Sequence, residues 1–295
     1  MQALAAWLVA RPQNAVIALA ATLLLPLLQM VSGVIMVLLV LKQGARIAVL
    51  EAAVAGVILA LVALVTGSPL MQILVAALST WLPAIMLGLV LQATRSLTLT
   101  LQVSALIAAL AVVGFYIVID DLVAYWDPVM TVLLEWTRAN NLQEQARLME
   151  SDPVMTANML TMAIVLSTWM LYSVYLVFGY WLYKLIPGES GDYGRFSDLN
   201  FGRVIALIMA LLSLLAFVTG AAWLQSVAFV LFAVFWLQGL AVVHWLHSVG
   251  NLPLLVVIMT YVLLPFLHVF LIMALAVLGY TDAWFTFRRR VAKQQ

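Results

Sequence analysis

The stretch DDLVAYWDPVMTVLLEWTRANNLQEQARLMESDP (residues 120–153) is the one place where this sequence stops being apolar for long. It holds seven of the chain's twelve acidic residues but only two basic ones, Arg138 and Arg147, so its net charge is about −5. Almost unbroken apolar sequence lies on both sides. We therefore expect an N-terminal half (residues 1–119), an extracytoplasmic segment (120–153) and a C-terminal half (154–295).

The composition indicates a membrane protein. Charged residues make up 8% of the chain, against about 25% in a typical soluble domain, and the mean hydropathy is +1.16. Residues 204–281 contain no Asp, Glu, Lys or Arg. About 20 apolar residues cross a bilayer core, so this run must hold more than one span. No alternating barrel pattern is present, and we predict an all-α integral membrane protein forming a single polytopic domain over residues 1–295.

Apolar sequence falls into about eight predicted helical blocks, preceded by a short interfacial helix anchored by Trp7 and Arg11. Prolines interrupt three of the blocks: Pro26 breaks the first, Pro83 the third and Pro265 the last. The blocks are residues 14–41, 47–65, 70–92, 97–119, 154–183, 204–219, 223–245 and 252–279.

The acidic segment predicts two short amphipathic helices on the membrane surface. Asp127 followed by Pro128 has the pattern of an N-cap and a first helical turn. Apolar residues then recur with helical spacing, and the pattern restarts after Asn141. A solvated loop with incidental periodicity is the alternative. Asp152 and Pro153 repeat the cap-then-proline start for the next block.

Sidedness depends on whether the first and last blocks fold back at Pro26 and Pro265. Lys and Arg in short loops mark the cytoplasmic side. With both ends folded back, both termini and the 184–203 loop are cytoplasmic, and eleven basic residues share that side. With two merely kinked long helices, the same residues are split between the two sides. The eleven are Arg11, Lys42, Arg46, Arg95, Lys184, Arg195, Arg203, Arg288, Arg289, Arg290 and Lys293.

Glu51 is an acid shortly after the start of an apolar block, where it is costly unless it is paired or faces water. We expect a structural salt bridge to Arg46, Lys42 or Arg95. A substrate or proton-coupling role is the alternative.

A ligand pocket with aromatic walls is a second candidate. Trp81, Trp169 and Tyr172 lie close in sequence to hydroxyl residues, a combination that suits a small-molecule site. Aromatic residues in membrane helices also serve packing and interfacial belts, and that remains the alternative. The hydroxyl residues are Ser79, Thr80, Ser167 and Thr168.

Histidines provide a third candidate group. His244 and His247 share one helical face with Trp236, and His268 is the only other histidine. A transition-metal site generally needs a third or fourth ligand, and the chain has no cysteine. We therefore expect satisfied or interfacial histidines, no metal and no cofactor, with Trp236, His244 and His268 retained as ligand-binding candidates.

The sequence lacks the motifs of common enzymes and of nucleic-acid binders. It has no phosphate loop, Ser-His-Asp order, paired intramembrane aspartates or His-Glu-x-x-His helix. Its net charge is +1, without a basic patch beyond the tail. We expect a protein that is not an enzyme and does not bind nucleic acid.

The tail combines an acid, aromatic residues and a basic run. Asp282 follows the last apolar residues, Trp284 and its neighbours suit the headgroup level, and Arg288, Arg289 and Arg290 come next. Arginines near anionic lipid contribute about 1 kcal/mol each. We predict that these five residues anchor the tail in the membrane and form an edge for docking a partner.

Several stretches together resemble the YybS-like family of uncharacterised bacterial inner-membrane proteins. They are WLPA (81–84), LQATRSL (91–97), the 180–196 loop with its Pro-Gly turn, and GYTDAW (279–284) followed by FRRR (287–290). Relatives look richer in glycine after Pro187 and usually have an acid where Thr286 stands. The resemblance implies a fold similar to the S components of energy-coupling-factor vitamin transporters and to the cell-shape protein MreD.

Two functions are compatible with these observations. The first is a small-molecule-binding, transporter-like membrane subunit that works with an energy-coupling membrane partner. The second is an MreD-like structural protein that organises envelope machinery through helix contacts. A pocket lined by both halves would favour the first function, and a packed centre with an exposed apolar groove would favour the second.

Overall fold

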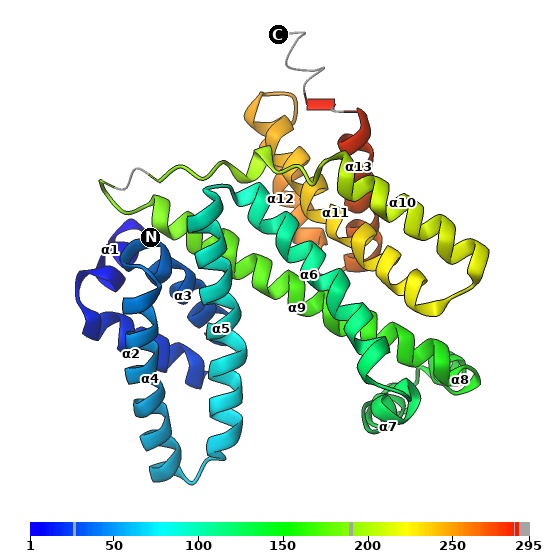
Figure 1. Cartoon of the computed structure of the whole chain (residues 1–295), viewed down its shortest axis with the longest axis horizontal. Coiled ribbons are helices and arrows are strands. Elements are labelled where there is room, and N and C mark those ends of the chain that lie inside the picture. Colours follow the sequence, from blue (N-terminus) through cyan, green and yellow to red (C-terminus); the bar gives the residue numbers. More distant parts are fainter. Residues whose placement is uncertain (26–27, 189–190, 286, 289–295) are drawn as a thin grey trace. The chain divides into compact units, whose positions relative to one another are not determined.

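A computed structural model describes residues 1–25, 28–188, 191–285 and 287–288, and within those ranges the chain is built of α-helices without a β-strand (Figure 1). The 3₁₀ turn η2 covers Phe196–Asp198. The α-helices are α1 (Gln2–Ala10), α2 (Pro12–Leu24), α3 (Gln29–Gln43), α4 (Ala45–Thr66), α5 (Leu70–Thr94), α6 (Leu97–Val118), α7 (Leu122–Ala139), α8 (Gln143–Ser151), α9 (Pro153–Lys184), α10 (Gly202–Thr219), α11 (Ala222–Ser248), α12 (Leu254–Leu263) and α13 (His268–Phe285).

Six helices in the described part of the chain are long and apolar enough to cross a bilayer: α4, α5, α6, α9, α10 and α11. They coincide with six of the eight blocks that the sequence predicts, all except the first and the last. Helices α1 and α2, bent by 112° relative to each other, form a possible seventh span. The prediction of an all-α, multi-pass protein is confirmed.

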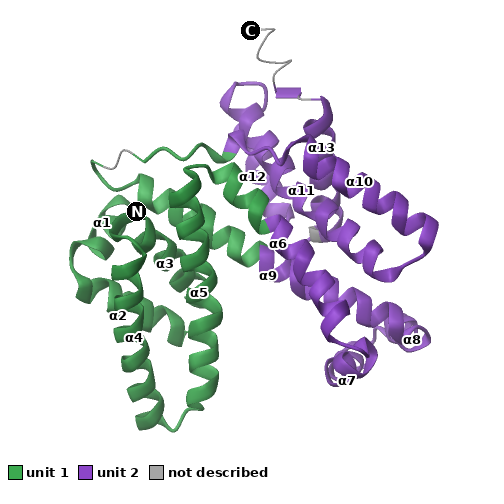
Figure 2. Cartoon of the chain, viewed as in Figure 1, with its two compact units in different colours: residues 1–104, 170–196 green, residues 105–169, 197–295 purple. Residues whose placement is uncertain are grey.

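The chain forms two compact units that differ from the expected halves (Figure 2). Unit 1 contains residues 1–104 and 170–196, and unit 2 contains residues 105–169 and 197–295. Helices α6 and α9 each contribute to both units. The acidic segment therefore lies within unit 2 and is not the boundary at which the contacts divide.

The first apolar block folds back on itself. Helix α2 ends at Leu24 and α3 begins at Gln29. The Ser32 hydroxyl, in the first turn of α3, donates a hydrogen bond to the carbonyl of Leu19 in α2 at 3.2 Å. The two short helices therefore lie side by side, as the folded-back interpretation of this block predicts. Pro26 itself lies outside the described residues.

The last apolar block is broken at its proline, and its second part packs closely on α11. Pro265 lies in the turn between α12 and α13. A β-carbon added at Gly239 of α11 would collide with the carbonyl of Leu275, and one at Gly279 of α13 would collide with the carbonyl of Phe235. Glycine at both positions lets the two helix backbones approach each other directly.

The acidic segment forms two helices, as predicted, but the first begins earlier than expected. Asp121 is its N-cap, and its Oδ1 accepts a hydrogen bond from the Ala124 amide at 3.0 Å. The predicted N-cap at Asp127 is wrong, because α7 has already begun there and continues through Pro128. Asp152 does cap α9, accepting from the Met155 amide at 2.8 Å.

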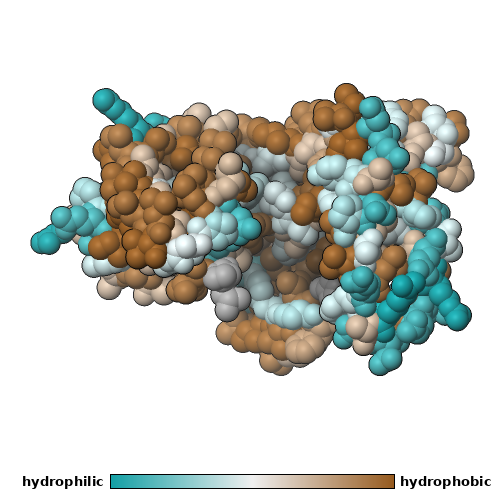
Figure 3. Space-filling model, turned by 90° about the horizontal axis from the view of Figure 1, so that it is seen from below, coloured by the Kyte–Doolittle hydropathy of each residue, from teal (hydrophilic) through white to brown (hydrophobic). Residues whose placement is uncertain are grey.

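The exposed surface agrees with α4 and α5 as membrane spans and with α7 and α8 as helices at the membrane surface (Figure 3). Large apolar side chains such as Leu64, Val65 and Met71 are exposed around the turn between α4 and α5. The surface in this region is almost uniformly hydrophobic. Hydrophilic residues gather over α7 and α8. The first surface suits contact with hydrocarbon, and the second suits contact with water or lipid headgroups.

Candidate functional site

Polar and aromatic side chains meet in unit 1 where the tip of the α2–α3 hairpin lies against the middle of α5. We call this the hairpin-tip cluster; it consists of Gln29, Ser32, Ser79, Thr80, Trp81, Tyr172 and Tyr175. Thr80 is the eleventh of the 25 residues of α5, about 15 Å along a helix about 37 Å long. The cluster therefore lies near the mid-depth of a candidate span, where polar groups are costly unless they are hydrogen-bonded.

Hydrogen bonds between side chains join the start of α3 to the middle of α5. The Trp81 indole N–H donates to the Ser32 hydroxyl at 2.8 Å. The Gln29 amide donates to the Thr80 hydroxyl at 3.1 Å. Ser32, Thr80 and Trp81 are all buried, whereas Gln29 is half-buried at the rim. The hairpin tip is thus fixed to the middle of α5 through polar contacts.

Pro83 explains why a backbone carbonyl is available in the middle of α5. Proline has no N–H, so it cannot donate to the carbonyl four residues earlier, which is that of Ser79. The Tyr172 hydroxyl of α9 donates to this carbonyl at 2.9 Å. The proline creates an acceptor at mid-depth, and a tyrosine from another helix satisfies it.

Small residues bring α9 against α3. A β-carbon at Gly33 would collide with the Tyr175 ring, and one at Gly179 would come within 2.6 Å of Val37. Tyr175 is 1% exposed, and its hydroxyl interacts with the Thr80 side chain. Gly33 therefore leaves space for the Tyr175 ring, and Gly179 lets α9 approach α3 at Val37.

The structure brings some of the predicted ligand-binding residues together in unit 1, and others belong to unit 2. Trp81 and Tyr172 meet in unit 1, beside Ser79 and Thr80 as expected. Trp169 is buried in unit 2, and so is Trp236, whose indole N–H has no hydrogen-bond partner among the described residues.

The predicted histidines form hydrogen bonds in unit 2. The His244 Nε2 and the Tyr261 hydroxyl are 2.8 Å apart, and the His247 Nδ1 lies 3.0 Å from the Leu252 carbonyl oxygen. The side chain of His268 is outside the described part. Among the side chains that are described, no three of His, Asp or Glu gather as metal ligands.

Glu51 does not form the predicted salt bridge. It is 4% exposed, and neither of its carboxylate oxygens has a hydrogen-bond partner in the described ranges. The Gln43 amide is a polar neighbour but lies outside standard hydrogen-bond geometry. Arg46 precedes Glu51 by five residues, about 140° around the helix, and is exposed on another face. Helical geometry therefore explains why the expected pairing with Arg46 does not form.

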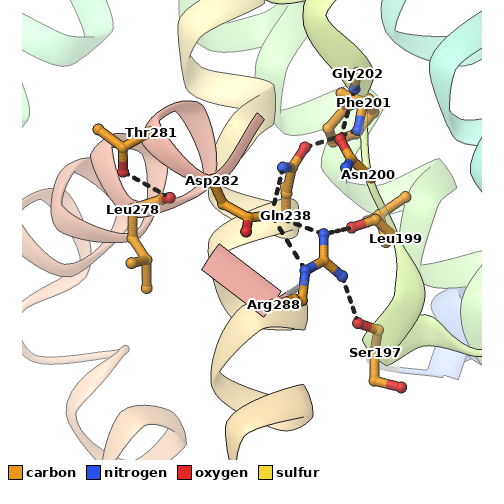
Figure 4. Close-up of polar contacts among 10 residues, drawn as sticks. All are labelled: Ser197, Leu199, Asn200, Phe201, Gly202, Gln238, Leu278, Thr281, Asp282 and Arg288. Atoms are coloured by element: carbon orange, nitrogen blue, oxygen red, sulfur yellow. Dashed lines mark hydrogen bonds and ion pairs between the residues drawn. The ribbon is translucent and has the colours of Figure 1, made fainter. Parts of the chain in front are cut away.

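A second polar cluster holds together the end of α13, the middle of α11 and the segment before α10 (Figure 4). The Asp282 Oδ2 accepts hydrogen bonds from Arg288 Nη2 at 2.8 Å and from the Gln238 amide at 3.0 Å. Arg288 also donates to the carbonyls of Ser197 at 2.7 Å and Leu199 at 2.8 Å. We call this the Asp282 cluster; it ties three chain segments of unit 2 together.

The Asp282 cluster corrects the lipid-anchor prediction for two residues. Asp282 is fully buried, and the side chain of its partner Arg288 is 11% exposed, so this arginine points into the protein and not toward lipid headgroups. A carboxylate buried on α13 is costly unless it is paired, and Arg288, six residues away, supplies the positive charge. The Trp284 carbonyl accepts a hydrogen bond from Arg203 at 3.1 Å. Arg289 and Arg290 lie outside the described residues.

The loop after α9 forms a smaller polar cluster. Lys184 lies 3.2 Å from Asp192, and the Tyr193 amide donates to the Tyr180 hydroxyl at 2.7 Å. Hydrogen bonds from Lys184 and from the Gly194 amide lower the pKa of the Asp192 carboxyl. The Tyr193 carbonyl accepts from the amide of Leu97, the first residue of α6, at 2.7 Å. The loop is thereby held against the start of α6.

An open apolar groove of about 420 Å³ runs between α10 and α11. It contains none of the residues singled out from the sequence. Its lining is Met209, Ser213, Ala216, Phe217, Gln225, Ala228, Phe229 and Phe232.

Sequence reasoning missed Gln29, Ser32, Tyr175 and Gln238 as members of these clusters. A sequence signal was available only for the contact between Ser79 and Tyr172, because the carbonyl that Pro83 leaves free can be located by counting back four residues. The Gln238–Asp282 contact joins positions 44 residues apart, and no periodicity in either helix indicates it.

Residues 14–283 match a family of predicted membrane proteins, DUF2232. The match covers most of the chain, so the protein belongs to this family. No curated protein and no solved structure matches it.

Proposed function

We propose that this member of the family is the small-molecule-binding subunit of a transporter in the bacterial inner membrane, comparable to the S components of energy-coupling-factor transporters. The observation that carries the proposal is the hairpin-tip cluster. A folded-back helix pair and a helix that contains a proline meet there at the mid-depth of a span. Binding sites of membrane transporters are typically formed by such broken helices near the midplane.

The groups at the rim of the cluster suggest what a ligand would contact. Gln29 donates its amide N–H to Thr80, so its side-chain carbonyl oxygen could accept a hydrogen bond from a ligand. The first N–H groups of α3 have no partner within the helix and favour a carbonyl or carboxylate group. Trp81 and Tyr172 supply apolar surface. A small, partly aromatic molecule bearing a carbonyl or carboxylate group fits these features.

A ligand would have to exchange hydrogen bonds already formed within the cluster. Trp81 donates to Ser32 and Gln29 donates to Thr80, so binding requires the start of α3 to move away from α5. Because α2 and α3 are short and connected through a break, their displacement would disturb less structure than movement of a full span. The YybS-like resemblance supports this proposal and suggests water-soluble vitamins as the first ligands to test. ATP hydrolysis would come from an energy-coupling partner.

A second candidate function is an MreD-like scaffold, favoured by the apolar groove between α10 and α11. A groove of this volume with phenylalanine and methionine in its lining suits a helix of a partner protein as well as lipid. In this alternative, the polar clusters stabilise the fold without binding a ligand.

Purification in mild detergent, followed by mass spectrometry of the associated proteins, distinguishes the two functions. The transporter proposal predicts recovery of an ATPase together with its membrane coupling subunit. Recovery of cell-wall synthesis proteins without an ATPase would support the scaffold instead. A variant with Phe229→Ala and Phe232→Ala serves as the matched comparison, because it changes the groove and leaves the hairpin-tip cluster intact.

A further inference from the structure

Two acidic residues are buried among those the structure describes, and they have opposite environments. Asp282 has a cation and an amide on one of its oxygens. Glu51 is buried to a similar degree and has no hydrogen-bond partner on either oxygen among the described residues. The pair provides an internal comparison, because one buried carboxyl group is neutralised by an arginine and the other is not.

The helices around Glu51 supply no compensating charge. Helix α4 packs against α2, α3 and α5, and neither α2 nor α5 contains a charged residue. The nearby cations are Lys42 on α3, Arg46 on α4 and Arg95 at the end of α5, and none forms an ion pair with Glu51 in the described part of the chain. Gln43, at the end of α3, is a polar neighbour of the Glu51 carboxyl group.

A carboxylate in this position would be an unpaired charge inside a membrane helix, which costs several kcal/mol. A bound metal cation would need additional oxygen ligands, and no cluster of His, Asp or Glu side chains in the described residues includes Glu51. A proton neutralises the group without any further ligand.

We propose that Glu51 is an intramembrane proton-binding site. Its carboxyl group is a neutral acid while α4 is packed against α2, α3 and α5. Glu51 is the seventh residue of α4, about 9 Å from the helix start. Separation of α4 from the end of α3 would therefore admit water from the nearby loop and release the proton. The proposal does not depend on the proposed function, since a scaffold could also contain such a site.

The test uses dicyclohexylcarbodiimide, an apolar reagent that reacts with protonated carboxyl groups in membranes. The carboxylic proton moves to a carbodiimide nitrogen while the carboxyl oxygen bonds to the central carbon. The adduct then rearranges to a stable N-acylurea that retains the whole reagent, with no oxidation and no leaving group. Peptide mass spectrometry of wild-type protein in membrane vesicles identifies the modified residue.

We expect modification at Glu51 and none at Asp282, whose carboxylate is paired with Arg288. Glu51→Gln should abolish the adduct, and Asp282→Asn should retain it. A water-soluble carbodiimide should modify exposed acids such as Glu144 and spare Glu51. The wild-type measurement remains decisive even where a variant fails to accumulate. Absence of the adduct at Glu51, an equal yield at Asp282, or equal reaction of Glu51 with the water-soluble reagent would overturn the proposal.

Discussion

The hydroxyl of Tyr172 donates a hydrogen bond to the backbone carbonyl of Ser79, the acceptor that Pro83 leaves free within α5. This contact connects a sequence signal, a proline in an apolar helix, to a side chain 93 positions from the acceptor. It also places a tyrosine at the rim of the hairpin-tip cluster.

Removing this contact should destabilise the protein in a way that depends on Pro83. Tyr172→Phe leaves the Ser79 carbonyl without its donor, at a cost of about 1–2 kcal/mol. In a Pro83→Ala background the alanine N–H can satisfy that carbonyl, so Tyr172→Phe should cost much less. Thermal unfolding in detergent of the wild type, both single variants and the double variant measures this coupling. Equal costs in the two backgrounds would show that Pro83 does not create the acceptor.

Close contact between α11 and α13 should make Gly239 intolerant of even one methyl group. Gly239→Ala places a β-carbon against the Leu275 carbonyl, so the two backbones must separate and lose packing contacts. We expect a marked fall in Tm or in the yield of folded protein. Gly114→Ala is the matched control, because no atom lies within 4 Å of a β-carbon there. Equal tolerance of both changes would contradict the described packing.

The Asp282–Arg288 pair should matter far more than an exposed ion pair. Asp282→Asn leaves Arg288 without its charge partner, and breaking a buried pair costs about 3–5 kcal/mol. Glu150→Gln removes the exposed contact with Arg138 and should cost no more than about 1 kcal/mol. Unfolding of both variants in one detergent tests the contrast. Similar effects would show that Asp282 is not buried in the membrane-embedded protein.

Sidedness can be tested cleanly because the chain contains no cysteine. The distribution of basic residues predicts that Asn140→Cys reacts with an impermeant maleimide added to intact cells, whereas Gln295→Cys reacts only after the membrane is opened. Asn140 is exposed in the turn after α7, so its accessibility does not depend on unfolding. Labelling of residue 295 from outside would exclude folded-back ends at both termini.

Much of the fold could be predicted from the sequence because hydropathy and proline positions are local signals. The six long spans and the breaks at the first and last blocks follow from them. The residue that caps α7 could not be predicted, because Asp121 and Asp127 have the same capping chemistry. Only the structure shows which of the two begins the helix. Arg46 is close to Glu51 in sequence but lies on another face, so proximity along the chain gave the wrong partner.

The candidate site was only partly predictable for a related reason. Trp81 and Tyr172 stood out as aromatic residues beside hydroxyls, and they do meet. Gln29 and Gln238 did not stand out, because a single amide in an apolar helix reveals its partner only when the helices are packed.

Ligand binding at the hairpin-tip cluster is tested most directly by thermal unfolding of the purified protein with water-soluble vitamins added one at a time. The proposal predicts that at least one vitamin raises the Tm of the wild type. Gln29→Leu should lose that shift. Phe229→Ala, which changes only the groove between α10 and α11, should keep it. A shift that survives Gln29→Leu but disappears with Phe229→Ala, or no shift with any vitamin, would contradict the assignment of the hairpin-tip cluster as a vitamin-binding site.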